Sequence, residues 1–108
     1  MGTDFNRELI LQLLKKGPEY RIFTSRARND LFNELKMSEE DCVLFIINSL
    51  EEGIELIYGQ TELEKFHGRD HWWFVNKTPT HVEAYIKVQI DSETEKIILI
   101  IISAHESK

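Results

Sequence analysis

Val82-Glu83-Ala84-Tyr85-Ile86-Lys87-Val88-Gln89-Ile90 is the stretch that decides the fold. Apolar and polar residues alternate along it, and a period of two places successive side chains on opposite faces of a β-strand. One face would then be core and would carry Val82, Ala84, Ile86, Val88 and Ile90. The other face would be available for chemistry and would carry Glu83, Tyr85, Lys87 and Gln89.

A second strand is predicted from Lys96 to His105, after a turn of polar residues over 91–95. If Ile90 pairs with Lys96, Tyr85 lies opposite Ile101, and His105 shares a face with Tyr85 and Lys87. A slip of one residue would move His105 to the other face, so the prediction depends on the turn. The run from Ile97 to Ile102 is apolar on both faces, which is typical of an interior strand.

The rest of the chain predicts helices first and strands afterwards. Helical spacing and capping residues predict helices over 5–14, 24–35 and 38–53, and the second helix should bury Ala27, Leu31, Phe32 and Leu35. Extended segments are predicted over 20–23, 54–58 and 71–75, with a long loop over 60–70. We therefore expect an α+β fold in which N-terminal helices pack on an antiparallel C-terminal β-sheet.

Length, composition and charge narrow the class of protein. A chain of 108 residues that is 42% hydrophobic can bury one core, so we expect a single domain over 1–108. Cys42 is the only cysteine, no signal peptide is recognisable, and no apolar run is long enough for a membrane, which predicts a cytoplasmic protein. The net charge of −6 argues against coating nucleic acid by bulk attraction, so any such role must be local.

Tyr85, Lys87 and His105 form the candidate catalytic set. Cleavage of RNA without a metal or other cofactor needs a base for the ribose 2′-hydroxyl, a cation for the phosphate and an acid for the leaving oxygen. Histidine can serve in either proton role, lysine supplies charge, and tyrosine donates a hydrogen bond or stacks on a base. The alternative is that these three residues are ordinary polar residues on a solvent-exposed strand and have no catalytic role.

Three other features have simpler interpretations. Trp72 and Trp73 must point to opposite faces of a strand, so one is expected in the core and the other could stack on a base. His67 and His71 are four residues apart in a segment without helical character, so no metal site is expected. Cys42 is expected to be a buried core residue.

Several segments together resemble the MqsR family of type II toxins, which share the RelE-like fold. The segments that carry the resemblance are 24–35, 38–50, Trp72-Trp73, Tyr85-Ile86-Lys87 and Ile101-Ile102-Ser103-Ala104-His105-Glu106. The resemblance implies an mRNA interferase that cuts single-stranded mRNA and is held inactive by a cognate antitoxin protein. It also matches the family's catalytic tyrosine to Tyr85 and its C-terminal basic residue to His105.

Two departures from the family pattern bear on activity. The family often has a lysine in the segment that matches Glu55-Leu56-Ile57-Tyr58, and often a glutamine where this chain has Trp73 or Phe74. Lys87, Lys77 or Arg69 could replace the phosphate cation, and Trp73 is the candidate for stacking on RNA. The alternative hypothesis is a non-catalytic interaction module that keeps the toxin fold, which the absent lysine and the low isoelectric point favour.

Overall fold

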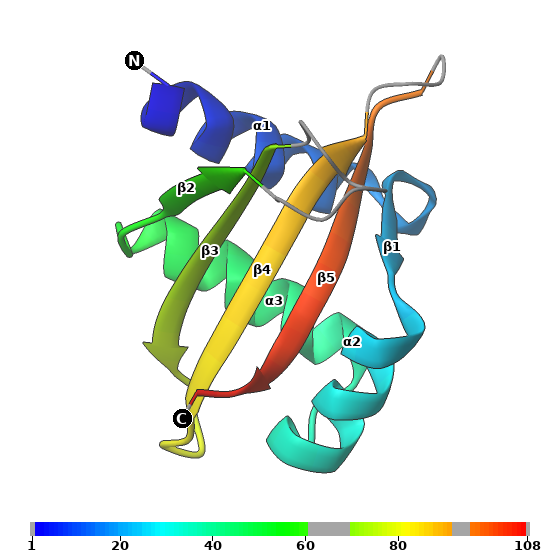
Figure 1. Ribbon diagram of the computed structural model, residues 1–108, viewed down its shortest axis with the longest axis vertical. Helices are drawn as coiled ribbons and strands as arrows, with labels where there is room; N and C mark the ends of the chain where they lie inside the picture. The colour runs from blue at the N-terminus through cyan, green and yellow to red at the C-terminus, as the bar shows by residue number, and fades with distance from the viewer. Residues whose placement is uncertain (1, 61–69, 92–95, 108) are drawn as a thin grey trace.

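Helices cover one face of a five-stranded β-sheet in the computed structural model, which describes residues 2–60, 70–91 and 96–107 (Figure 1). The helical elements are α1 (Gly2–Lys16), a 3-10 turn η1 (Pro18–Tyr20), α2 (Ser25–Asp30), a π-helical turn η2 (Leu31–Leu35) and α3 (Glu39–Glu51). The strands are β1 (Arg21–Phe23), β2 (Ile57–Gln60), β3 (Asp70–Lys77), β4 (Glu83–Asp91) and β5 (Ile98–Glu106). The predicted α+β class is confirmed.

The order of strands in the sheet is β1-β5-β4-β3-β2. Strands β2, β3, β4 and β5 pair with one another in antiparallel fashion, as predicted, and β5 is an interior strand. The predicted antiparallel sheet of C-terminal strands gains one further strand at its edge, where β1 pairs with β5 in parallel. This edge strand is only three residues long and comes from the N-terminal half, so the sheet is mixed.

Side-chain caps fix where the helices begin and end. Ser38 Oγ accepts a hydrogen bond from the Asp41 N–H at the start of α3 (3.0 Å), as its sequence pattern predicts. The Arg7 guanidinium of α1 donates to the carbonyls of Leu50 (3.0 Å) and Ile54 (2.8 Å) at the other end of α3. A cation at a helix C-terminus also interacts favourably with the helix dipole, so Arg7 joins the two long helices.

The second predicted helix differs from the structure in one respect. It divides into α2 and the π-helical turn η2, and the prediction that Phe32 is buried is wrong, because 73% of this side chain is exposed. Ala27, Leu31 and Leu35 are buried as expected. None of the helices in the described ranges is both long and apolar enough to cross a membrane.

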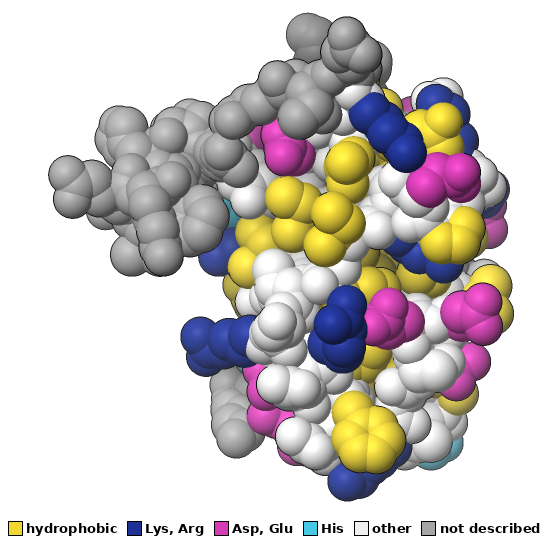
Figure 2. Space-filling view, turned by 90° about the vertical axis from the view of Figure 1, so that its right-hand side faces the viewer, with side chains coloured by type: hydrophobic (Ala, Val, Ile, Leu, Met, Phe, Trp, Pro, Cys, Tyr) yellow, Lys and Arg dark blue, Asp and Glu magenta, His cyan; other side chains and the backbone are white. Residues whose placement is uncertain are grey.

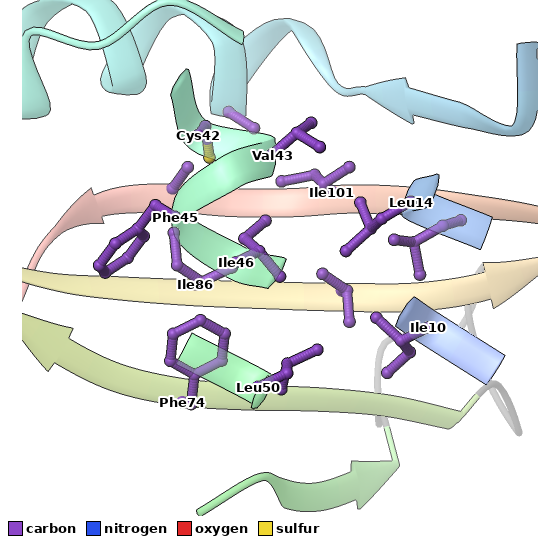
Figure 3. Close-up of a cluster of buried hydrophobic side chains, with 14 of the residues drawn as sticks. Ile10, Leu14, Cys42, Val43, Phe45, Ile46, Leu50, Phe74, Ile86 and Ile101 are labelled. Atoms are coloured by element: carbon purple, nitrogen blue, oxygen red, sulfur yellow. The ribbon is translucent and has the colours of Figure 1, made fainter. Parts of the chain in front are cut away.

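The core lies between α3, α1 and one face of the sheet (Figure 3). Its buried side chains include Ile10 and Leu14 of α1, Cys42, Val43, Phe45, Ile46 and Leu50 of α3, and Phe74, Ile86 and Ile101 of the strands. On β4 the predicted alternation is confirmed: Ala84, Ile86 and Val88 are at most 2% exposed. Tyr85 and Lys87 therefore point to the other face, which we call the open face.

The predicted register of the last hairpin is wrong. Tyr85 pairs with His105 rather than with Ile101, and Ile90 pairs with Leu99 rather than with Lys96. Ile101 is fully buried on the core face. The turn that would have fixed this register lies largely in residues 92–95, outside the described residues, as does most of the predicted loop over 60–70.

We expect Ile101→Val to lower the free energy of unfolding by about 1 kcal/mol, the usual loss when a buried methylene is removed. The matched control is Ile22→Val in β1, where the side chain is 51% exposed and the change should stay within about 0.5 kcal/mol. Urea denaturation of both variants measures the difference. Equal losses in the two variants would contradict the observed register.

Candidate active site on the open face

Three aromatic rings lie side by side across the open face, one on each of β3, β4 and β5. The rings of Trp73 and Tyr85 are stacked with centroids 5.4 Å apart and planes 25° apart. Tyr85 and His105 are stacked at 5.1 Å and 15°. The register produces this ring ladder, because Tyr85 lies directly opposite His105, and Trp73 is its diagonal neighbour on β3. The two predicted catalytic rings are therefore in contact.

Lys87 occupies the middle of the open face. It lies opposite Trp73 on β3 and opposite Ser103 on β5. His105 and His71 are its diagonal neighbours, at about 7–8 Å between backbones, a distance that a lysine side chain can cover. All three predicted catalytic residues thus share one face and lie within reach of one another.

A hydrogen bond fixes the tautomer of the neutral His105 ring. Its Nδ1 lies 3.0 Å from the backbone carbonyl oxygen of Glu106. A carbonyl can only accept, so in the neutral ring Nδ1 carries the proton and Nε2 carries the lone pair. His105 is therefore set to accept a proton at Nε2.

Tyr85 is suited to donate a proton, whereas His105 is suited to accept one. Burial raises the pKa of its hydroxyl above the ordinary value of 10, because the phenolate would be poorly solvated between the neighbouring rings. Tyr85 remains protonated at neutral pH and acts as a hydrogen-bond donor rather than as a base.

His71 is a further titratable group on the open face that sequence reasoning considered only as a metal ligand. Its ring lies over Gly59 of β2, where a Cβ atom would come within 2.7 Å of the His71 Nε2. Burial lowers the pKa of His71, the positive charge of Lys87 lowers it further, and Asp70 partly offsets both. Alternation along 71–75 already placed His71 on the same face as Trp73, and this was the available signal.

His71 is not a direct neighbour of His105 on the open face. Lys87 lies between them, and two diagonals of about 7–8 Å each separate their backbones by about 15 Å.

A shallow cavity of about 300 Å³ adjoins His105 at the side of α2 and η2. Arg26, Asp30, Glu34 and Glu106 line it with His105. Glu34 Oε1 accepts a hydrogen bond from the Glu106 N–H (3.0 Å), and Arg26 lies 3.9 Å from Asp30. Carboxylates thus outnumber cations on this side of His105, so a phosphate would favour the Lys87 side.

The remaining predicted residues lie apart from this group. Lys77 is at the exposed end of β3, opposite Glu83, and lines a separate cavity of about 540 Å³ beside α3. Arg69 lies outside the described residues.

Trp72 is 4% exposed in the core and Trp73 lies on the open face, which confirms their predicted separation. Cys42 is buried as expected, and burial raises its pKa to about 12.

Across the described ranges, no group of three histidine, cysteine, aspartate or glutamate side chains is arranged to hold a metal ion. His67, one half of the pair considered in the sequence, is outside those ranges. On β2, the Tyr58 hydroxyl donates a hydrogen bond to Asp70 Oδ1 (2.6 Å).

We expect Lys87→Met to raise the pKa of His71 and Asp70→Asn to lower it, because each removes one of the charges that act on the ring. A histidine with a depressed folded pKa loses stability as pH falls below the unfolded value of 6.5, so Lys87→Met should also lessen that acid destabilisation. NMR titration of His71 measures the shift. Lys77→Met, at the far end of β3, is the control, and an equal shift there would contradict the assignment to Lys87.

Comparison of the chain with protein-family models, curated proteins and solved structures gives no match in any of the three. The resemblance to the MqsR family therefore stays a prediction from short motifs, and the geometry of the open face has to be interpreted through its own chemistry.

Proposed function

We propose that this protein is an endoribonuclease that cuts single-stranded RNA on the open face without a metal, and that it acts as the toxin of a type II toxin-antitoxin system. One observation carries the proposal: the stacked rings of Tyr85 and His105, 5.1 Å apart, with Lys87 as the diagonal neighbour of His105. These are the proton acceptor, donor and cation that RNA cleavage requires.

The proposed reaction is a transfer within the RNA. His105 Nε2 takes the proton of a ribose 2′-hydroxyl, the 2′ oxygen forms a bond to phosphorus, and the bond to the 5′ oxygen breaks. Tyr85 gives its proton to the departing oxygen, because an alkoxide is a stronger base than a phenolate. Lys87 stabilises the charge on the phosphate oxygens. The products are a 2′,3′-cyclic phosphate and a 5′-hydroxyl, and the proton on His105 returns to Tyr85 through solvent.

The ring ladder also restricts how RNA would bind. Tyr85 stands between two stacked rings, so both of its faces are occupied. A base can stack only at an end of the ladder, on the outer face of Trp73 or of His105. The sugar and phosphate would then pass over the ring edges, where the Tyr85 hydroxyl and the Lys87 ammonium are available.

A toxin of this kind needs an inhibitor. The proposed partner is a cognate antitoxin that acts in the cytoplasm and blocks access to the open face. This part of the proposal rests on the family resemblance in the Tyr85-Ile86-Lys87 and Ser103-Ala104-His105 motifs.

A second candidate is a binding module with the same fold and no catalysis. The carboxylates of Asp30, Glu34 and Glu106 beside His105 favour it, because they repel phosphate. The net charge of −6 also repels phosphate and so favours the binding module. Figure 2, which looks at the β1 side of the molecule, shows basic and acidic side chains intermixed rather than gathered by sign.

The two candidates differ in one measurement. Purified protein is incubated with a labelled RNA of mixed sequence in EDTA, and the ends of the products are identified. We expect cleavage that leaves cyclic phosphates, a loss of about a hundredfold or more in His105→Ala, and a smaller loss in Tyr85→Phe. His81→Asn is the matched control, since His81 is exposed in the turn before β4.

Wild-type rates in both His105→Ala and Tyr85→Phe would remove this site from the reaction. No cleavage by well-folded wild-type protein would reject the ribonuclease and favour the binding module. RNA binding without cleavage, measured by anisotropy, would also reject the catalytic proposal.

A further inference from the structure

Strand β5 changes the face on which it buries its side chains. Leu99 and Ile101 are both fully buried against the core, but the next core residue is Ala104, three positions after Ile101. The register shows why: Val88 pairs with Ile101, whereas Lys87 pairs with Ser103. One residue of β4 is thus matched by two of β5, which makes Ile102 the extra residue of a β-bulge.

This bulge determines which residues reach the site. In an uninterrupted strand, residues 99, 101, 103 and 105 would all share the core face. Ser103 and His105 would then point at the helices, away from Tyr85 and Lys87. With the bulge, Ala104 is in the core and His105 stacks on Tyr85.

Thr24, at the start of α2, binds the bulge directly. Its N–H donates to the carbonyl of Ile101 (3.1 Å), and its hydroxyl donates to the carbonyl of Ile102 (3.1 Å). The same hydroxyl accepts from the Ala27 N–H (3.1 Å), which caps α2. A hydroxyl has one proton and can accept as well, so a single atom serves both contacts.

Position along the sheet explains why this contact is needed. The pairing of β1 with β5 ends at Phe23 and Ile101, immediately before Thr24 and the bulge. The Thr24 hydroxyl therefore supplies a hydrogen-bond donor to the residue that the bulge takes out of register with β4.

We propose that Thr24 is a positioning residue of the site: it holds the bulge at Ile102 and thereby keeps Ser103 and His105 on the open face beside Lys87 and Tyr85. For its effect on activity this inference rests on the proposed ribonuclease function. The effect of Thr24 on the geometry of His105 is independent of that proposed function.

Three substitutions of Thr24 distinguish the two hydrogen bonds of its hydroxyl, one to the Ile102 carbonyl and one from the Ala27 N–H. Thr24→Ser keeps both. Thr24→Asp keeps the cap, because a carboxylate accepts from the Ala27 N–H, but it cannot donate to the Ile102 carbonyl. Thr24→Val loses both. Ser38→Ala removes the equivalent cap of α3, where the Ser38 hydroxyl accepts from the Asp41 N–H, and it is the control for lost capping alone.

The first readout is the position of the His105 ring protons in NMR spectra, which the stacked Tyr85 ring shifts. In Thr24→Asp and Thr24→Val we expect these resonances to move toward those of a Tyr85→Leu variant, which lacks the stacked ring. They should stay at wild-type values in Thr24→Ser and Ser38→Ala. The second readout is RNA cleavage, where kcat should fall about ten- to a hundredfold in Thr24→Asp with KM little changed.

Unmoved His105 resonances in Thr24→Asp would overturn the proposal, as would an equal movement in Ser38→Ala. If Thr24→Val does not fold, Thr24→Asp still decides, because its helix cap is intact. If wild-type protein cuts no RNA, the ribonuclease proposal fails, while the resonance experiment still accepts or rejects the role of Thr24.

Discussion

The burial of one face of β4 is the constraint on which the rest of the molecule depends. Ala84, Ile86 and Val88 are buried in the core, and a strand has only two faces. Tyr85 and Lys87 are therefore held on the opposite side, in the interior of the sheet, where neighbouring strands restrict their movement. Trp73 takes its place beside β4 through strand pairing, and His105 through the pairing and the bulge of β5. Core packing and the candidate chemistry are thus two results of the same alternation.

The sequence was a good guide to β4 and a poor one to β5, for a physical reason. On β4 the alternation of polar and apolar residues indicates which side chains are buried. On β5 the run from Ile97 to Ile102 is apolar throughout, so it identifies an interior strand but not the orientation of each residue. His105 does share a face with Tyr85, as predicted, but the assumed pairing was wrong and the face depends on a bulge that no local pattern indicates.

Other differences have equally specific causes. The helical spacing of residues 24–35 gave no sign of the π-helical turn, which leaves Phe32 exposed. Strand β1 was recognised as an extended segment, but its parallel partner lies in β5, almost eighty residues later, and no short pattern could reveal that. His71 had the right alternation but was not predicted on the open face, because its four-residue spacing from His67 is also a spacing found among metal ligands. Side-chain chemistry and a family resemblance predicted Tyr85 and His105 as candidate site residues, and the structure shows that their rings are stacked.

The hydrogen bond between Thr24 and Ile102 joins residues that are 78 positions apart. Hairpins such as β3–β4 close short loops and can form early in folding, whereas a contact of this span requires most of the chain to be organised first. The contact that orients His105 should therefore form later than the hairpins of the sheet. The arrangement of the open face would then be among the last features to appear as the protein folds and among the first to be lost as it unfolds.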